Sequence, residues 1–230
     1  MRTYNIVKTY FKRESGKIDH AWFSDRFKIF EEYTLRSLRK QSFQDFRLWV
    51  WSQKGLENEM DELRKIVPKA VITFGEHYTE ACEDLPRLKR SDWVYVTRID
   101  SDDVYRWDAV ELASRCLPKK EGRVPEASMF LKGYVYELGT KRVGIYRKSS
   151  TPFHTIMFPA EIFLDPDRYE EAFFGDHSHV RRKYPTQVLP DYRFCVLIHK
   201  RNFHSTFNSL ATSESSMRRF DVHRFIDRDR

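Results

Sequence analysis

The acidic segment at residues 100–103 has the residue types and spacing best suited to chemistry. The stretch VTRIDSDDVY places Asp100, Asp102 and Asp103 within four residues, directly after an apolar run. Neighbouring carboxylates raise one another's pKa, and a divalent cation relieves that repulsion. Carboxylate oxygens suit Mg²⁺ and Mn²⁺, and Mg²⁺ often shares its coordination with substrate phosphates. The segment therefore predicts a metal or phosphate site, with a turn and helix N-cap as the alternative interpretation.

The elements expected to position this segment alternate between strand and helix. Strand patterns occupy residues 4–10, 46–51, 70–74 and 93–99, and helical patterns occupy residues 26–40, 56–67 and 107–116. Such alternation predicts an α/β fold, with a mixed but mostly parallel sheet flanked by helices. Ligands of these sheets bind beyond the carboxyl ends of the strands, where the acidic segment is expected.

The second half of the chain has a different pattern. Strands are expected at 127–138, 142–146, 153–158 and 193–199, with short helices at 159–163 and 176–184. The first helix is expected to be N-capped by Ser24 or Asp25. Residues 206–230 form a polar tail, which the sequence leaves open as a packed helix or a partly disordered segment.

Composition limits the class of protein. Of the 230 residues, 40% are hydrophobic and 15% aromatic, which excludes disorder for most of the chain. The three cysteines are far apart and predict neither a disulfide framework nor a zinc knuckle. With no apolar run long enough to span a membrane and no secretory signal pattern, we expect a soluble, cytoplasmic protein.

The net charge of +7 has two interpretations. The simpler one is a solvated basic face. The functional one is an anionic partner, such as nucleotide phosphates, nucleic acid or an acidic membrane surface.

Four motifs occur in order along the chain. They are an Arg-rich first helix with a Ser-Leu…Gln…Phe pattern (Ser37, Leu38, Gln41, Phe43 and Phe46), RIDSDD at 98–103, SSTPFHTI at 149–156, and IHKRN at 198–202. Together they resemble the nucleotide-sugar glycosyltransferases of the GT-A fold, and more closely the rhamnosyltransferase group with its bacterial and phage relatives. The resemblance covers about residues 1–205. It implies one GT-A-like domain, with a nucleotide-sugar-binding half at 1–118 and an acceptor half at 119–205.

The resemblance implies a role for each acidic residue. Asp102 binds the metal that bridges the donor diphosphate, Asp100 contacts the metal or the nucleotide ribose, and Asp103 supports them. The late strand-terminal histidine, His199, completes the metal coordination; a buried histidine with satisfied hydrogen bonds is the alternative. The implied cofactor is Mn²⁺ or Mg²⁺, which neutralises the leaving nucleoside diphosphate of the nucleotide sugar.

An inverting transfer also needs a base that takes the proton of the acceptor hydroxyl. The resemblance places an acid near the start of a helix under the acceptor site, and the matching stretch is FFGDHSHV. Asp176 is the candidate base and His177 the alternative. Gly175 departs from the Glu-Asp pair of the family, and a simple N-cap is the other role open to Asp176.

Four basic residues are candidates for binding the nucleotide sugar. Lys8 and Arg13 lie at or just after the end of the first strand, where GT-A folds hold the nucleotide base. Arg26 faces the donor site from the loop–helix junction, and Arg98 pairs with the acidic segment or with a phosphate. Each is equally explained as a surface cation.

The function expected from these residues is metal-dependent transfer of a sugar to an acceptor hydroxyl. The acceptor classes left open are a glycan, a lipid-linked sugar, and DNA with hydroxymethylated bases, as for some phage enzymes. A phosphatase of the haloacid dehalogenase type is a competing class, because residues 100–104 also fit its DxDx[TV] motif, although that fold expects the motif on its first strand. A basic nucleic-acid-binding module is the non-enzymatic alternative, without a matching signature.

Overall fold

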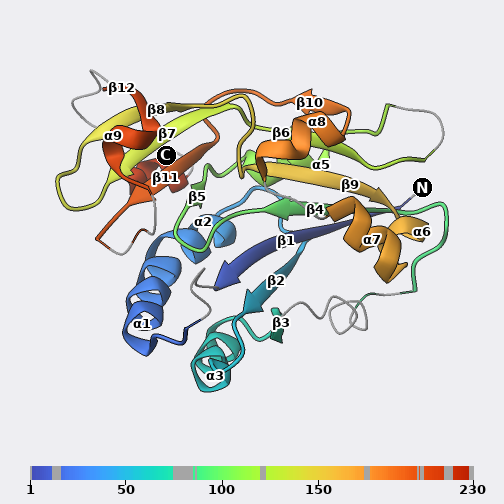
Figure 1. Cartoon of the computed structure of the whole chain (residues 1–230), viewed down its shortest axis with the longest axis horizontal. Coiled ribbons are helices and arrows are strands. Elements are labelled where there is room, and N and C mark those ends of the chain that lie inside the picture. The colour runs from blue at the N-terminus through green and yellow to red at the C-terminus, as the bar shows by residue number, and fades with distance from the viewer. Residues whose placement is uncertain are drawn as a thin grey trace.

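The computed structural model describes residues 2–11, 17–74, 85, 87–119, 123–173, 177–200, 202, 205–214 and 220–227. Two β-sheets and their flanking helices make up this part of the chain (Figure 1). Among the described residues, no helix is long and apolar enough to cross a membrane.

The larger sheet has seven strands in the order β10-β6-β9-β4-β1-β2-β3. The first half of the chain supplies β1 (Thr3–Phe11), β2 (Arg47–Ser52), β3 (Val71–Phe74) and β4 (Trp93–Arg98), which pair in parallel. The second half adds β6 (Glu126–Met129), β9 (His154–Pro159) and β10 (Thr186–Val188). Strand β9 runs antiparallel to β4 and β6, whereas β10 is parallel to β6. The predicted mixed, mostly parallel sheet is confirmed.

The smaller sheet has five strands in the order β12-β8-β7-β11-β5. They are β5 (Val104–Tyr105), β7 (Lys132–Glu137), β8 (Val143–Arg147), β11 (Phe194–Ile198) and β12 (Ala211–Glu214). Figure 1 shows this sheet at the upper left, above helix α1. Because β4 belongs to the larger sheet and β5 to the smaller one, the acidic segment between them joins the two sheets.

One predicted strand, at 127–138, is wrong as a single element. It divides into β6 and β7, which belong to different sheets. The break falls at Phe130, which is buried and whose N–H donates to the carbonyl of Phe153 at 3.0 Å. Continuous β-type residue composition hides such a change of sheet, because both strands have the same local pattern.

Helices cover both faces of the larger sheet. One face packs against α1 (His20–Ile29), α2 (Arg36–Arg39), α3 (Glu57–Ile66) and α5 (Ala109–Ser114). The other face packs against α6 (Ala160–Phe163), α7 (Pro166–Phe173) and α8 (Val180–Lys183). Because side chains alternate along β4, Val94 and Val96 pack on the face that is covered by α6, α7 and α8, and Arg98 lies on that same face.

The first helix begins earlier than expected. Asp19 is its N-cap and accepts a hydrogen bond from the N–H of Trp22 at 2.9 Å, so the predicted caps Ser24 and Asp25 are wrong. The helix starts there because Trp22 and Phe23 are both buried and extend the apolar face toward the N-terminus. A π-helical segment, Phe30–Leu35, joins α1 to α2.

The polar tail is ordered where it is described. It forms α9 (Phe207–Leu210), strand β12 against β8, and α10 (Val222–Ile226). Val222 and Ile226 pack with buried residues of the smaller sheet. The predicted helix at 176–184 consists, from residue 177, of a 3₁₀ turn (His177–His179) followed by α8. The domain limits at 118 and 205 stay a prediction.

Candidate active site

The acidic segment forms a turn at the carboxyl end of β4. The N–H of Asp103 donates to the carbonyl of Asp100 at 3.1 Å, and the hydroxyl of Tyr105 donates to the carbonyl of Arg98 at 2.6 Å. Asp102 and Asp103 are buried, whereas the Asp100 side chain is 32% exposed. The turn therefore holds three adjacent carboxylates in different environments.

The Ser-Leu…Gln motif fixes the chain that follows this turn. The hydroxyl of Ser37 donates to the carbonyl of Thr34 at 2.7 Å and accepts from the N–H of Tyr105 at 3.3 Å. The Gln41 amide donates to the carbonyl of Arg106 and accepts from the N–H of Val110, both at 2.9 Å. Both polar side chains are buried, so these bonds tie α2 to β5 and α5 and hold the acidic turn in place.

Asp102 is the centre of one group of side chains, which we call the Asp102 cluster: Arg26, Ser101, Asp102, His199 and Asn202. One oxygen of Asp102, Oδ2, accepts from Arg26, from His199 Nε2 at 3.1 Å and from Asn202 Nδ2 at 3.2 Å. Arg26 Nε also donates to the hydroxyl of Ser101 at 2.9 Å. The side chains of Asp102 and His199 are each 6% exposed. The cluster joins α1, the acidic turn and the segment after β11, which are far apart in the sequence.

Asp103 has a structural environment instead. Its Oδ1 accepts from the N–H of Leu197 in β11 at 3.2 Å. Burial raises the pKa of this carboxyl well above its usual value, and the charges of Asp102 and Asp100 raise it further. This carboxyl holds the acidic turn against β11, and the supporting role that the resemblance implies for it stays a prediction.

Asp100 belongs to a second group, on the other face of β4, which we call the Asp100 cluster: Lys8, Arg98, Asp100, His154 and His177. Arg98 Nε donates to Asp100 Oδ1 at 3.1 Å. Burial alone would raise the pKa of Asp100, but the charges of Arg98 and Arg26 outweigh it and lower that pKa. Asp100 is therefore ionised and held by a cation.

Lys8 is fully buried, and its Nζ lies 3.3 Å from the centroid of the Trp51 ring. Burial, followed by the charge of Arg98, lowers the pKa of Lys8 well below its usual value. The surface-cation interpretation is thus wrong for Lys8, while its role toward a nucleotide stays a prediction.

The predicted bases are only partly within the described residues. His177 is described: its carbonyl accepts from the hydroxyl of Ser150 at 2.5 Å, and its charge contributes to the lowered pKa of Asp100. Asp176 and Arg13 lie outside the described residues. The choice between Asp176 and His177 as base stays a prediction.

Two side chains of the site had no role in the sequence interpretation. His154 lies within the SSTPFHTI motif and Asn202 within IHKRN. Asn202 holds the His199 main chain by accepting from its N–H, donates to the carbonyl of Leu197 at 3.2 Å, and contacts Asp102. The IHKRN motif was the available signal, because it places an amide side chain three residues after the strand-terminal histidine.

The Asp102 cluster offers two candidate ligand atoms for a divalent cation. Among the described residues, no group of three or more His, Cys, Asp or Glu side chains could hold a metal ion. Two candidate ligand atoms do meet, because His199 Nε2 lies 3.1 Å from Asp102 Oδ2. Adjacent ligands of an octahedral ion with bonds of about 2.1 Å are about 3 Å apart. Mg²⁺ sites with one or two protein carboxylates and substrate phosphates have this number of protein ligands.

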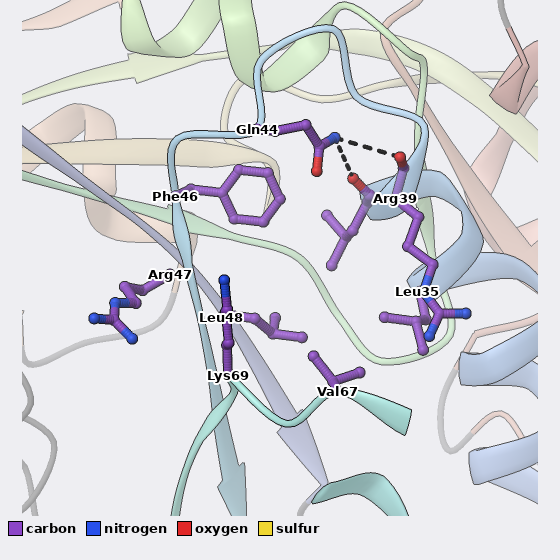
Figure 2. A pocket seen from close by; sticks show the side chains of 9 residues that line it. Leu35, Arg39, Gln44, Phe46, Arg47, Leu48, Val67 and Lys69 are labelled. Carbon is purple, nitrogen blue, oxygen red and sulfur yellow. Dashed lines mark hydrogen bonds between the residues drawn. The ribbon is translucent and has the colours of Figure 1, made fainter. Parts of the chain in front are cut away.

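A pocket of about 470 Å³ lies away from this site. Its lining is Leu35, Leu38, Arg39, Gln44, Phe46, Arg47, Leu48, Val67 and Lys69 (Figure 2). Arg47 and Leu48 begin β2, which runs parallel to β1 and, through it, to β4. The pocket is therefore at the strand ends opposite the acidic turn, and none of the candidate site residues lines it.

Two solved structures illustrate what the fold is similar to. The chain aligns with S. aureus TarS 1–349 at 15% identity and a TM-score of 0.47, over 86% of this chain and 60% of that one. It aligns with the inositol-1-phosphate CTP transferase from T. maritima at 9% identity and a TM-score of 0.45, over 89% and 93%. The chain thus spans 60% of the TarS fragment, and likenesses this weak leave function to the residues themselves.

The sequence itself matches a family of enzymes. A search among curated proteins found no significant match. The model of the family described as "Putative rhamnosyl transferase" matches residues 5–210, which include the acidic turn, His154, His199 and Asn202. The chain therefore belongs to this family of glycosyltransferases, as its four motifs predicted.

Proposed function

We propose that the chain transfers a sugar from a nucleotide-sugar donor to an acceptor hydroxyl, with inversion, and that Asp102 and His199 hold Mn²⁺ or Mg²⁺. The observation that carries the proposal is the Asp102 cluster. A carboxylate after a strand of one sheet and an imidazole after a strand of the other meet at 3.1 Å beside an arginine. Their position beyond the carboxyl end of β4 is where open α/β sheets bind ligands.

In this proposal the residues of the two clusters have different roles. Arg26 and Arg98 bind phosphate oxygens, since planar guanidinium groups match phosphate geometry. Asn202 orients His199 and Asp102, and Asp103 keeps β11 against the acidic turn. The cation, when bound, neutralises charge that develops on the leaving diphosphate. The acceptor's proton passes to Asp176 or His177, and the acceptor is a glycan, a lipid-linked sugar or modified DNA.

The proposal is tested on Asp102. With nucleotide sugars as donors and Mn²⁺ present, we expect Asp102→Asn to lower donor turnover at least about a hundredfold, because a metal ligand contributes several kcal/mol of charge stabilisation. Asp61→Asn is the matched control: Asp61 lies on α3 with a 58% exposed side chain. Circular dichroism shows whether each variant is folded. Full turnover by a folded Asp102→Asn variant would refute the role of Asp102.

A further inference from the structure

His154 is a member of the Asp100 cluster to which the sequence interpretation gave no role. It begins β9, where Thr155 pairs with Thr97 of β4 in antiparallel register. The same register sets His154 opposite Arg98, on the same face of the sheet. The residue is 4% exposed. The imidazole therefore sits at the same end of the sheet as the acidic turn, beside the arginine that holds Asp100.

The hydrogen bonding of His154 defines which of its ring nitrogens carries the proton. Nδ1 lies 3.1 Å from the carbonyl oxygen of Thr151. A carbonyl only accepts, so Nδ1 carries the proton and Nε2 keeps a lone pair. Burial, and then the charge of Arg98, lower the pKa of His154 to about 3. The ring is therefore neutral near pH 7, and Nε2 is an acceptor.

The surrounding loop fixes this orientation. The hydroxyl of Thr151 donates to the carbonyl of Phe130 at 2.6 Å, and it accepts from the N–H of Phe153 at 3.3 Å. The ring of Phe153 stacks on Phe194, with centroids 3.8 Å apart. The SSTPFHTI motif thus builds a rigid support that holds one imidazole in one tautomer.

The charges near His154 indicate the kind of group that Nε2 accepts from. Arg98 lies opposite His154 in the register of β4 and β9, and Arg98 Nε donates to Asp100 Oδ1 at 3.1 Å, so both charges lie at this end of the sheet. A phosphate oxygen is attracted by Arg98 and repelled by a lone pair on Nε2. A hydroxyl is the complementary group, because its proton fits the lone pair.

We infer that Nε2 of His154 accepts a hydrogen bond from a hydroxyl of the sugar carried by the nucleotide donor. This inference rests on the proposed function and deepens it. The diphosphate is expected near Arg98 and the Asp102 cluster, and the sugar is the next group along the donor. His154 is then a specificity residue, which distinguishes a nucleotide sugar from its free nucleoside diphosphate.

Three substitutions separate this role from a structural one. His154→Asn keeps an N–H donor near Thr151 but has no acceptor at the position of Nε2. His154→Gln carries its amide oxygen to about that position, and His154→Phe fills the volume without either polar atom. The probes for calorimetry are dTDP with dTDP-rhamnose, UDP with UDP-glucose, and GDP with GDP-mannose, each with Mn²⁺.

The expected result is selective. His154→Asn and His154→Phe should bind the nucleoside diphosphate as the wild type does, but bind the nucleotide sugar about tenfold more weakly, since a lost hydrogen bond of about 1.4 kcal/mol corresponds to that change in affinity. His154→Gln should recover most of that affinity. Equal losses for both probes, or no loss in His154→Asn, would overturn the inference while nucleotide-sugar binding by the wild type upholds the proposed function. A wild type that binds none of the nucleotide sugars would refute both.

Discussion

Asp102 and Asp100 stand two residues apart in one turn, yet their surroundings differ in almost every respect. Asp102 is buried and one of its oxygens accepts from Arg26, His199 and Asn202. The Asp100 side chain is 32% exposed and accepts a hydrogen bond from Arg98 Nε at 3.1 Å. The same residue type at alternate positions is thus divided between two faces of the sheet.

Under the proposed function, that difference lets one acidic motif bind two parts of a ligand. The Asp102 cluster draws its members from both sheets and from α1, so its geometry depends on the whole fold. The Asp100 cluster combines three residues from neighbouring strands of the larger sheet with Asp100 of the turn and His177 of the 3₁₀ turn, and it includes a neutral histidine beside an arginine. We therefore propose a charged group for the Asp102 cluster, and the boundary between a phosphate and a hydroxyl for the Asp100 cluster.

The largest expected effect breaks the Asp102 cluster. Arg26→Gln leaves the buried Asp102 without its cation, and we expect unfolding to require about 3 kcal/mol less free energy. Adding Asp102→Asn should restore most of that loss, since no buried charge then remains unpaired. Urea denaturation of the wild type, both single variants and the double variant gives the coupling energy. Losses that simply add would contradict a coupled pair.

The next largest effect is a pH dependence of the stability, which arises from His154 in the Asp100 cluster. His154 is neutral in the fold with a pKa of about 3, whereas an unfolded histidine has a pKa of about 6.5. As the pH falls, the imidazole of His154 is therefore protonated in the unfolded chain before it is protonated in the fold. The stability that this histidine contributes is fully present above pH 6.5 and is lost as the pH falls toward 3. The slope is at most about 1.4 kcal/mol per pH unit.

His154→Gln should flatten this slope between pH 6.5 and 5, as measured by denaturation at several pH values. His179→Gln, at an exposed histidine, is the control. An unchanged slope in His154→Gln would show that the fold does not lower the pKa of His154.

The smallest expected effect is the change in stability on replacing Asp103. Its pKa is raised, so its charged form is disfavoured in the fold and stability falls as the pH rises from about 4 through the folded pKa. Asp103→Asn keeps an oxygen for the N–H of Leu197 and removes the charge. We expect it to be more stable than the wild type by about 1 kcal/mol at pH 8, with little difference at pH 4. A thermal unfolding series checks this, and a loss of stability at pH 8 would contradict it.

The sequence predicted the first half of the fold well because its strands and helices alternate with clear periodicity. It predicted the acidic turn at the end of β4 for the same reason. It missed the division of 127–138 into β6 and β7, since a strand that changes sheet keeps its β-type residues. It also misplaced the start of α1, because the apolar face set by Trp22 and Phe23 begins before the expected caps.

The site residues also divide into contacts that could be expected from the sequence and contacts that could not. Contact between Asp102 and His199 could be expected from the family resemblance, and the structure brings the two together at 3.1 Å. The burial of Lys8 and the acceptor atom of His154 could not be predicted. Both depend on the strand pairing that places these residues on the same face of the sheet as Arg98. Tertiary pairing decides that, and local pattern does not.

One measurement tests the central claim most directly: calorimetric titration of dTDP, UDP and GDP into the wild type, with Mn²⁺ and with EDTA, and into Asp102→Asn with Mn²⁺. If Asp102 and His199 hold the cation that binds the donor, one diphosphate should bind the wild type with Mn²⁺ and at least about a hundredfold more weakly with EDTA, because one interaction between ion and phosphate contributes several kcal/mol. Asp102→Asn with Mn²⁺ should resemble the wild type with EDTA. Equal affinity under all three conditions would contradict the account.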